Sequence, residues 1–264
     1  MNIYVRLTHE FNKGKLRAVL SSGQAVVLHR IAVMSKDGDW ILKESGESLE
    51  HVISILNNHN AGYRFGAPLD LRWMRGGWSS HFEFREDKLR IRTDFATRPP
   101  RLSEDDIRLM WQEQKQNDIP IVNVRQLAEL KKTNREKDYA VIGELARLMK
   151  NPEDEMMFSR SARDLIKLAA AHPELVKQLV PKRPALKAIN EGEHQLEKAL
   201  DAERRELMHA NEARLQRYMK SAEAWASLWP DVSSAIEGLP LKEAHKVVVS
   251  RAEGVLPFEP LEGC

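Results

Sequence analysis

The chain lacks the features that define several classes of protein. It has a single cysteine, Cys264, so an intrachain disulfide is excluded, which is typical of proteins from a reducing compartment. No stretch approaches the ~20 apolar residues that a membrane-spanning helix needs, and residues 1–10 lack the apolar segment of a secretion signal. We therefore expect a soluble, cytoplasmic protein with no membrane partner.

Strong net charge is also missing. The 41 Lys and Arg residues nearly balance the 39 Asp and Glu residues, which leaves a formal charge of +2. Such a balance gives no general attraction to nucleic acid or membranes, so any basic binding surface must be local. Internal repeats and low-complexity tracts are absent. With 264 residues and 42% hydrophobic content, the chain can form one large domain or two modest ones around a real core.

The first hundred residues mix short strand patterns with short helix patterns. Apolar runs that end at turn residues predict strands at 17–20, 39–42, 69–74, 81–84 and 89–95. Helical spacing predicts a short helix at 24–31 and another that begins at Ser48, a favourable N-cap. The two prolines at 99 and 100 then end the predicted sheet region.

Helical patterns dominate from residue 103 onward. Helices are predicted at 105–114, 127–132, 135–148, 161–179 with a break near Pro173, and 241–252. Residues 181–184 are typical of a linker, and 188–228 predict a long charged helix that Pro230 ends. The sequence thus predicts an α+β fold. A small mixed β-sheet core (1–102) precedes a helical extension (103–180) and a charged helical C-terminal region (181–264).

Three acidic residues are candidates for a metal site. Asp37 and Asp39 are two positions apart, so on a strand their side chains share one face. Two such carboxylates can hold Mg²⁺ against a triphosphate, and Asp94, on a later predicted strand, could bind a second metal or accept a proton. Asp70 is a rival for the third position. The alternatives are an ordinary turn at 37–39 and an Asp94 that faces water.

A turn of small residues comes before the first of these acids. Ser22 and Gly23 directly precede a predicted helix, and exposed backbone N–H groups at such a turn suit a phosphate. The alternative is an ordinary connection between a strand and a helix.

These segments resemble the nucleotidyltransferase superfamily, particularly the minimal bacterial type related to AbiEii-like toxins. In that family a strand leads into a small-residue turn, a short helix with Ala-Val-x-x-His, and a Thr-x-Asp-x-Asp motif. Residues 22–23, 25–29 and 35–39 are similar to these motifs in the same order. Residues 92–95 resemble the family's later strand with its third acid, and 131–138 resemble its helix with a Lys-x-x-x-Arg-x-Lys-Asp signature.

The resemblance implies a nucleotidyltransferase-like fold and a metal-dependent enzyme. It would transfer a nucleoside monophosphate from a nucleoside triphosphate (NTP) to a hydroxyl of RNA, protein or a small molecule, as the toxin of a toxin–antitoxin system. Asp37, Asp39 and Asp94 would be catalytic and would hold two Mg²⁺ ions. The residues expected near the nucleotide are Ser22, Gly23, Lys131, Arg135 and Lys137.

The sequence departs from the family pattern in ways that support an alternative. Arg30 follows the histidine where the family often has glycine, and Val33 stands where an arginine often precedes the first acid. The family's long first helix is missing or shortened. The alternative is a catalytically degenerate scaffold that binds a protein partner, or a second copy of the chain, through the C-terminal helices.

Other side chains also have two interpretations. The ring side chains around 76–77 could stack on a base or form a hairpin packed on the core; they are Trp73, Trp78, His81 and Phe82. His29 fits a packed histidine better than a metal ligand. The charged residues at 135–138 fit a nucleotide site and a solvated helix face equally well.

Overall fold

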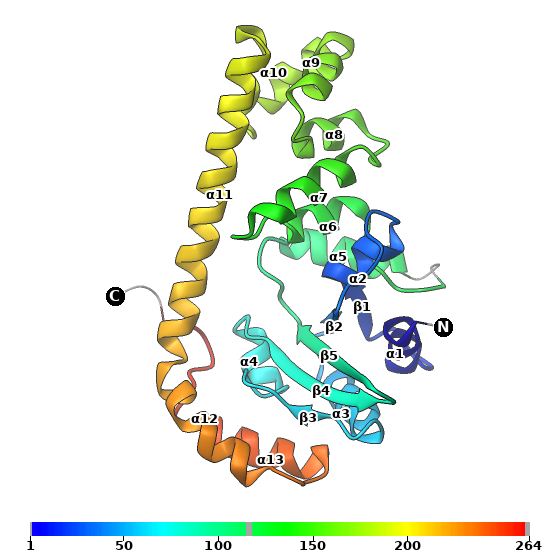
Figure 1. The fold of residues 1–264 in the computed structure, drawn as a ribbon, viewed down its shortest axis with the longest axis vertical. Helices are drawn as coiled ribbons and strands as arrows, with labels where there is room; N and C mark the ends of the chain where they lie inside the picture. The colour runs from blue at the N-terminus through cyan, green and yellow to red at the C-terminus, as the bar shows by residue number, and fades with distance from the viewer. Residues whose placement is uncertain (1, 115–117, 262–264) are drawn as a thin grey trace. The chain divides into compact units, whose positions relative to one another are not determined.

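The structure, a computed structural model, describes residues 2–114 and 118–261 (Figure 1). Its elements, in chain order, are α1 (Ile3–Phe11), β1 (Ala18–Ser21), α2 (Ser22–Leu28), β2 (Asp37–Leu42), α3 (Gly46–Asn58), β3 (Gly62–Tyr63), α4 (Leu71–Arg75), β4 (Ser80–Glu86), β5 (Leu89–Ala96), α5 (Glu104–Glu113), α6 (Val124–Leu130), α7 (Glu136–Ala146), α8 (Pro152–Phe158), α9 (Ala162–Ala171), α10 (Pro173–Leu179), the 3₁₀ helix η2 (Pro184–Glu191), α11 (Glu193–Ser221), α12 (Glu223–Ala235) and α13 (Leu241–Ala252).

Backbone contacts divide the chain into two compact units. The first comprises residues 1–122 together with 215–264, and the second comprises residues 123–214. This division does not coincide with the boundaries at 102 and 180 that the sequence suggests. The last fifty residues return to the first unit, and such long-range packing leaves no local pattern in the sequence.

The first unit is built on a mixed sheet of five strands in the order β1-β2-β5-β4-β3. Strands β2 and β5 are parallel, whereas the other neighbouring pairs are antiparallel. Residues 120–122 add to the edge of β1, because Leu20 N–H donates to Pro120 O at 2.9 Å and Leu20 O accepts from Val122 N–H at 3.0 Å. The α+β fold with a mixed sheet is therefore confirmed, and helices predominate toward the C-terminus.

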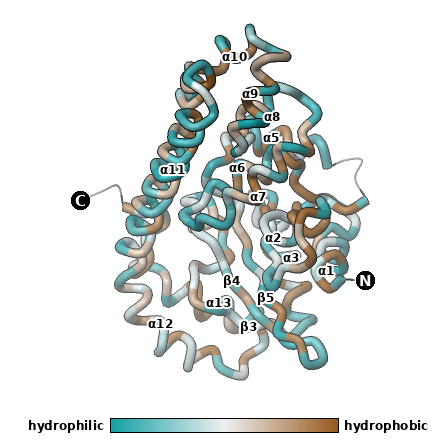
Figure 2. The backbone as a smooth tube through the Cα atoms, turned by 45° about the horizontal axis from the view of Figure 1, so that its top comes forward, coloured by the Kyte–Doolittle hydropathy of each residue, from teal (hydrophilic) through white to brown (hydrophobic). Residues whose placement is uncertain are grey.

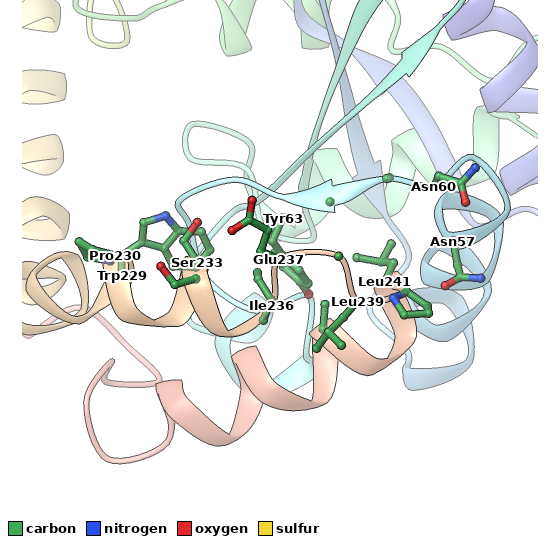
Figure 3. Close-up of a pocket in the computed structure, with 16 residues that line it drawn as sticks. Asn57, Asn60, Tyr63, Trp229, Pro230, Ser233, Ile236, Glu237, Leu239 and Leu241 are labelled. Carbon is green, nitrogen blue, oxygen red and sulfur yellow. The ribbon is translucent and has the colours of Figure 1, made fainter.

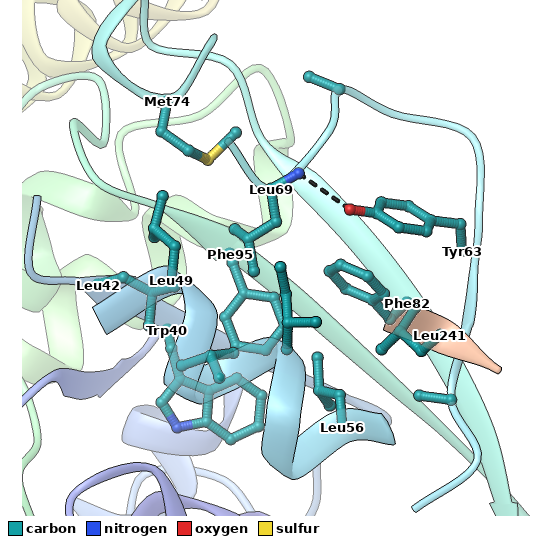
Figure 4. Close-up of a cluster of buried hydrophobic side chains, with 14 of the residues drawn as sticks. Trp40, Leu42, Leu49, Leu56, Tyr63, Leu69, Met74, Phe82, Phe95 and Leu241 are labelled. Carbon is teal, nitrogen blue, oxygen red and sulfur yellow. Dashed lines mark hydrogen bonds between the residues drawn. The ribbon is translucent and has the colours of Figure 1, made fainter. Parts of the chain in front are cut away.

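One face of this sheet forms the main core (Figure 4). The rings of Trp40 and Phe95 stack at 5.4 Å across β2 and β5, and Phe11 of α1 meets Trp40 edge-on at 5.2 Å. Leu49 and Leu56 of α3 join the same cluster. Because side chains alternate along a strand, burying this face leaves the residues between them on the opposite face.

Three buried tryptophans attach distant segments of the first unit to this core. The indole N–H of Trp225 in α12 donates to Gly66 O at 2.9 Å. The indoles of Trp73 and Trp78 donate to Leu256 O and Pro257 O, each at 3.0 Å. Buried indole N–H groups require acceptors, so these bonds fix where α12 and the C-terminal segment lie in this unit.

The second unit is helical and has its own core of Met156, Leu165, Leu179, Leu196 and Leu200. The last two come from α11, which is otherwise hydrophilic along most of its length (Figure 2). None of the described helices, over residues 2–114 and 118–261, combines the length and apolar character needed to cross a bilayer.

Several predicted elements are wrong. Residues 69–74 are not a strand, since α4 begins at Leu71 with Asp70 as its N-cap. The first helix is present as α1, and α3 is capped by Ser45, whose side chain accepts from Ser48 N–H. Pro230 does not end a helix but lies inside α12.

The stretch at 181–184 is packed rather than extended as a linker. Arg183 is only 2% exposed and donates to Met156 O at 2.6 Å and to Ser159 O at 2.8 Å. The following residues form η2, so the predicted long helix is shorter and begins at Glu193.

Candidate functional site

The acids of β2 and β5 lie on the sheet face opposite the aromatic core. The parallel register pairs Asp39 directly with Asp94, and Asp37 with Arg92. Because Asp37 and Asp39 are two residues apart on β2, their side chains share a face, which is also the face of Asp94. The fold thus gathers three carboxylates from two neighbouring strands.

One oxygen of Asp37 has no hydrogen bond. Its Oδ1 is enclosed by protein and accepts no hydrogen bond, and the guanidinium of Arg92 lies 3.8 Å from it. Enclosed polar atoms are usually satisfied, so an oxygen of this kind is available to a further cationic or hydrogen-bonding group.

Tyr4 of α1 lies close to the start of β2, and the three acids affect its pKa. Its hydroxyl donates to Lys36 O at 2.5 Å, one residue before Asp37. Burial and then the negative charge of Asp37 raise the pKa of Tyr4, and Asp39 and Asp94 add to the effect. Burial is the largest cause of this shift, and the three acids add a smaller contribution of the same sign.

Asp94 already has two partners. Its Oδ1 accepts from His81 Nδ1 at 2.7 Å and lies 3.4 Å from Arg64 Nη1. The antiparallel register places His81 of β4 directly opposite Asp94, and Arg64 N–H donates to His81 O at 2.9 Å. Sequence reasoning assigned neither His81 nor Arg64 to this site. The only available signal was that two neighbouring predicted strands could place a histidine opposite the acid.

The turn at residues 22–23 adjoins the acidic strand. Ser21 Oγ donates to Asp39 O at 3.1 Å, and Ser22 has a φ of +51°, which is uncommon for a residue other than glycine. A Cβ at Gly23 would overlap Ser35 Oγ, so close packing explains this glycine without any phosphate. The same left-handed backbone occurs at Arg30, Asn60, Asp87 and Arg101, so it does not distinguish this turn as a binding site.

The three basic residues expected near the nucleotide belong to the second unit. Lys131 is buried and its Nζ lies 3.4 Å from Asp138 Oδ1, while Arg135 Nε donates to Asp138 Oδ2 at 2.9 Å. Burial acts to raise the pKa of Asp138, but the bond from Thr133 and the two cations lower it below its ordinary value. Lys137 is exposed. In the described unit, Lys131 and Arg135 therefore stabilise a buried carboxylate.

Asp70 is not a third acid of this site. It caps α4, where its Oδ1 accepts from Arg72 N–H at 3.0 Å and from Arg72 Nε at 2.9 Å. The rival assignment depended on a strand at 69–74, and the helix there removes its basis.

The aromatic residues around Gly76 and Gly77 pack on the core rather than forming a platform for bases. Trp73 and Phe82 are fully buried and Trp78 is 6% exposed. His81 does not belong to this group, because it alternates with Phe82 and faces the acids. His29 is a packed histidine, whose Nε2–H donates to Val122 O at 2.8 Å.

A spacious cavity lies elsewhere in the first unit (Figure 3). It encloses about 820 Å³ between α3, β3, α12 and the start of α13. Trp229, Ile236 and Leu239 line it with a few polar groups, and among the described residues of its lining only Glu237 is charged. None of the predicted site residues lines this cavity. We place the candidate chemistry at the acidic sheet face, because convergent ionisable groups there can act on a substrate.

The acids do not form a preassembled metal cage. Within residues 2–114 and 118–261, no group of three or more His, Cys, Asp or Glu side chains is arranged to hold a metal ion. Mg²⁺, however, is commonly bound through one or two carboxylates, with waters and substrate phosphates completing its shell. The unbonded oxygen of Asp37 and the paired Asp39 and Asp94 fit that kind of site.

Comparisons with known proteins add little to this geometry. No family model and no curated protein matches the chain. Among solved structures, the crystal structure of JHP933 from Helicobacter pylori is similar with a TM-score of 0.37 and 12% identity, covering 81% of this chain and 93% of that one. A likeness of this degree carries no argument about function.

Proposed function

We propose that the chain is a metal-dependent nucleotidyltransferase, which moves a nucleoside monophosphate from an NTP to a hydroxyl. The supporting observation is the direct pairing of Asp39 with Asp94 across β2 and β5, with Asp37 on the same face. The resemblance of residues 18–39 and 92–95 to that superfamily assigns the same three acids to the reaction. The acceptor would be RNA, a protein or a small molecule.

The residues of this face have separable tasks in the proposed reaction. Asp37 and Asp39 would hold Mg²⁺, and Asp94 would complete the site through the oxygen that His81 and Arg64 leave free. The bound metal supplies positive charge to the triphosphate and to the leaving pyrophosphate. Arg92 and Arg64 flank the acids and limit the repulsion that a triphosphate would meet on a surface of three carboxylates.

Binding of Mg²⁺ and NTP tests the proposal directly. Isothermal titration with a non-hydrolysable analogue of each NTP should give micromolar binding that requires Mg²⁺. Asp39→Asn should weaken it at least ~10-fold, because an uncharged amide is a poor ligand for a hard cation. Release of pyrophosphate from NTP should fall with it.

Asp70→Asn is the matched control. Asparagine caps helices as well as aspartate does, so this variant removes one carboxylate outside the site and keeps α4 capped. We expect its nucleotide binding to equal that of the unchanged protein. If a folded Asp37→Asn/Asp39→Asn double variant binds Mg²⁺ and NTP normally, the proposal fails. A folded chain that binds no NTP would favour the degenerate scaffold.

The resemblance extends the proposal to a toxin. Expression of the unchanged chain in a bacterial host would then arrest growth, and the Asp39→Asn variant would not. Equal growth of the two strains would contradict the toxin role and leave the enzymatic proposal to the binding experiments.

A further inference from the structure

A hydroxyl, an imidazole and a carboxylate form a hydrogen-bonded chain on the polar face of the sheet. Ser79 Oγ lies 3.0 Å from His81 Nε2, and His81 Nδ1 lies 2.7 Å from Asp94 Oδ1. Ser79 immediately precedes β4, His81 lies on that strand, and Asp94 lies opposite His81 on β5. No sequence motif singles out Ser79.

The partners of the imidazole determine where its proton lies. An ionised carboxylate only accepts hydrogen bonds, so His81 Nδ1 bears the proton that is donated to Asp94. His81 Nε2 is then an acceptor, and the Ser79 hydroxyl donates to it. This is the order of groups in which a histidine can take the proton of an attacking serine while an acid orients the ring.

The local backbone keeps this chain of groups in place. A Cβ at Gly66 would overlap the His81 ring, so glycine allows the loop before α4 to lie against the imidazole. Ser79 O accepts from Ala67 N–H at 3.1 Å, which ties the same loop to the start of β4. Groups held on strands and restrained by neighbours are preorganised for reaction.

The chain of groups can be reached from solvent and has a cation beside it. Ser79 and His81 are half-buried, and the side chain of Arg64, next to Asp94, is 32% exposed. Its positive charge lies at the Asp94 end of this chain of groups and helps to hold that carboxylate in place.

We propose that Ser79 is a nucleophile that hydrolyses carboxylic esters, an activity separate from nucleotidyl transfer. Ser79 Oγ bonds to the carbonyl carbon, and its proton passes to His81 Nε2. The bond to the ester oxygen breaks, and the leaving alkoxide takes that proton. Water, deprotonated by His81, then attacks the acyl-serine and releases the carboxylic acid and the free hydroxyl. Asp94 orients the ring and does not change its protonation.

A fluorophosphonate probe tests the reactivity of Ser79 without metal or nucleotide. In this reaction the Ser79 Oγ–phosphorus bond forms, fluoride leaves and His81 receives the proton. We expect the full-length protein to gain one probe mass, which peptide mapping locates at Ser79. Intact-mass measurement after incubation with p-nitrophenyl acetate should show an acetyl group on the same residue.

Labelling of three variants shows whether Ser79 reacts because His81 activates it or only because it is exposed. Ser79→Ala should abolish the labelling. His81→Asn keeps an N–H donor toward Asp94 but loses the Nε2 acceptor, and we expect it to slow labelling at least ~100-fold. Ser227→Ala is the control, since Ser227 is exposed and its hydroxyl bonds only a carbonyl, Glu223 O, at 3.0 Å.

Thermal unfolding first confirms that each variant folds, so that a change in labelling reports on the reactivity of Ser79. Labelling confined to Ser79 and dependent on His81 supports the proposal. Equal slow labelling of the unchanged protein and Ser79→Ala, or labelling spread over other serines, overturns it and leaves a hydrogen-bonded chain that only stabilises the sheet. Neither result bears on Mg²⁺ or NTP binding.

Discussion

Asp94 is the residue that the two proposed activities share. One of its oxygens orients His81, and its charge would also help to hold Mg²⁺ beside Asp39. Asp94→Asn should therefore reduce Mg²⁺-dependent NTP binding. It should also slow fluorophosphonate labelling of Ser79 by about 10²- to 10⁴-fold, because a neutral amide neither fixes the His81 tautomer nor stabilises the imidazolium that forms.

A second single substitution, Asp37→Asn, distinguishes the two activities. The Asp37 carboxylate lies beside Arg92, whereas Asp94 bonds His81, so loss of the Asp37 charge should weaken metal and nucleotide binding only. Labelling rates and titration calorimetry on the two variants provide the comparison. If Asp94→Asn left both measurements unchanged, neither proposed role of this carboxylate would stand.

His245 of α13 makes the first unit sensitive to acid. Its Nδ1 accepts a 2.7 Å hydrogen bond from the Tyr63 hydroxyl, which in turn accepts from Leu69 N–H at 3.1 Å. Burial lowers the pKa of His245, although the charge of Asp70 opposes the shift. The unfolded chain therefore binds a proton more readily than the folded one at mildly acidic pH.

The sign of the pH dependence follows from this difference. Above the ordinary histidine pKa of about 6.5 both states are neutral and the stability is fully present. As the pH falls below that value, the unfolded state gains protons first, so the free energy of unfolding decreases. Urea unfolding from pH 8 to pH 5 should show a decrease that His245→Gln reduces. A difference between the two proteins that does not vary with pH would contradict this assignment.

At the scale of elements, β2 depends on a glycine. Gly38 lies between Asp37 and Asp39 and faces the core, where a Cβ would overlap the rings of Tyr4 and Trp40. Gly38→Ala should destabilise the protein by about 1–3 kcal/mol in chemical denaturation, as overpacked cores do, and should displace the two acids.

Gly46→Ala is the control substitution for the stability effect of Gly38→Ala. Gly46 begins α3, and a Cβ added there would meet no atom within 4 Å, so alanine fits. Its stability should stay equal or rise by about 0.4–1 kcal/mol, because alanine restricts the unfolded chain. Equal effects of the two substitutions would show that the ring contacts at Gly38 are unimportant.

Elements with a strong local pattern could be predicted from the sequence, and those set by distant contacts could not. Strands β1, β2, β4 and β5 follow apolar runs between turn residues, and all are present. The residues predicted as a strand at 69–74 instead form α4. Asp70 caps this helix, and the buried Trp73 donates a hydrogen bond to Leu256 O, which lies far away in the sequence. Helix α1 was not predicted, although Tyr4, Leu7 and Phe11 repeat at helical intervals.

The candidate site divides in the same way. The spacing of Asp37 and Asp39 is a local property of the sequence. The position of Asp94 beside Asp39 depends on strand order, since β5 inserts between β2 and β4. The hydrogen bonds of His81 depend further on the register of β4 with β5, which no periodicity specifies.

At the scale of the whole molecule, the two units have separate cores and can differ in stability. The second unit also contains a largely buried cluster of charges, in which Glu203 pairs with Arg183, at 2.9 Å, and with Arg160. Burial acts to raise the pKa of Glu203, but the hydrogen bond and charge of Arg183 lower it below its ordinary value. Removing Arg183 leaves Glu203 with Arg160 alone and takes the donor from Met156 O and Ser159 O.

Arg183→Leu should therefore destabilise the second unit selectively, by about 3–5 kcal/mol. Hydrogen exchange followed by mass spectrometry should show faster exchange in peptides from residues 123–214, with peptides from residues 2–114 unchanged. Arg163→Ala is the control, because the Arg163 side chain is 78% exposed and its ion pair with Glu193 contributes little. Faster exchange in both units of the Arg183→Leu variant would mean that the chain unfolds as one cooperative structure, and the division into two units would then have no energetic counterpart.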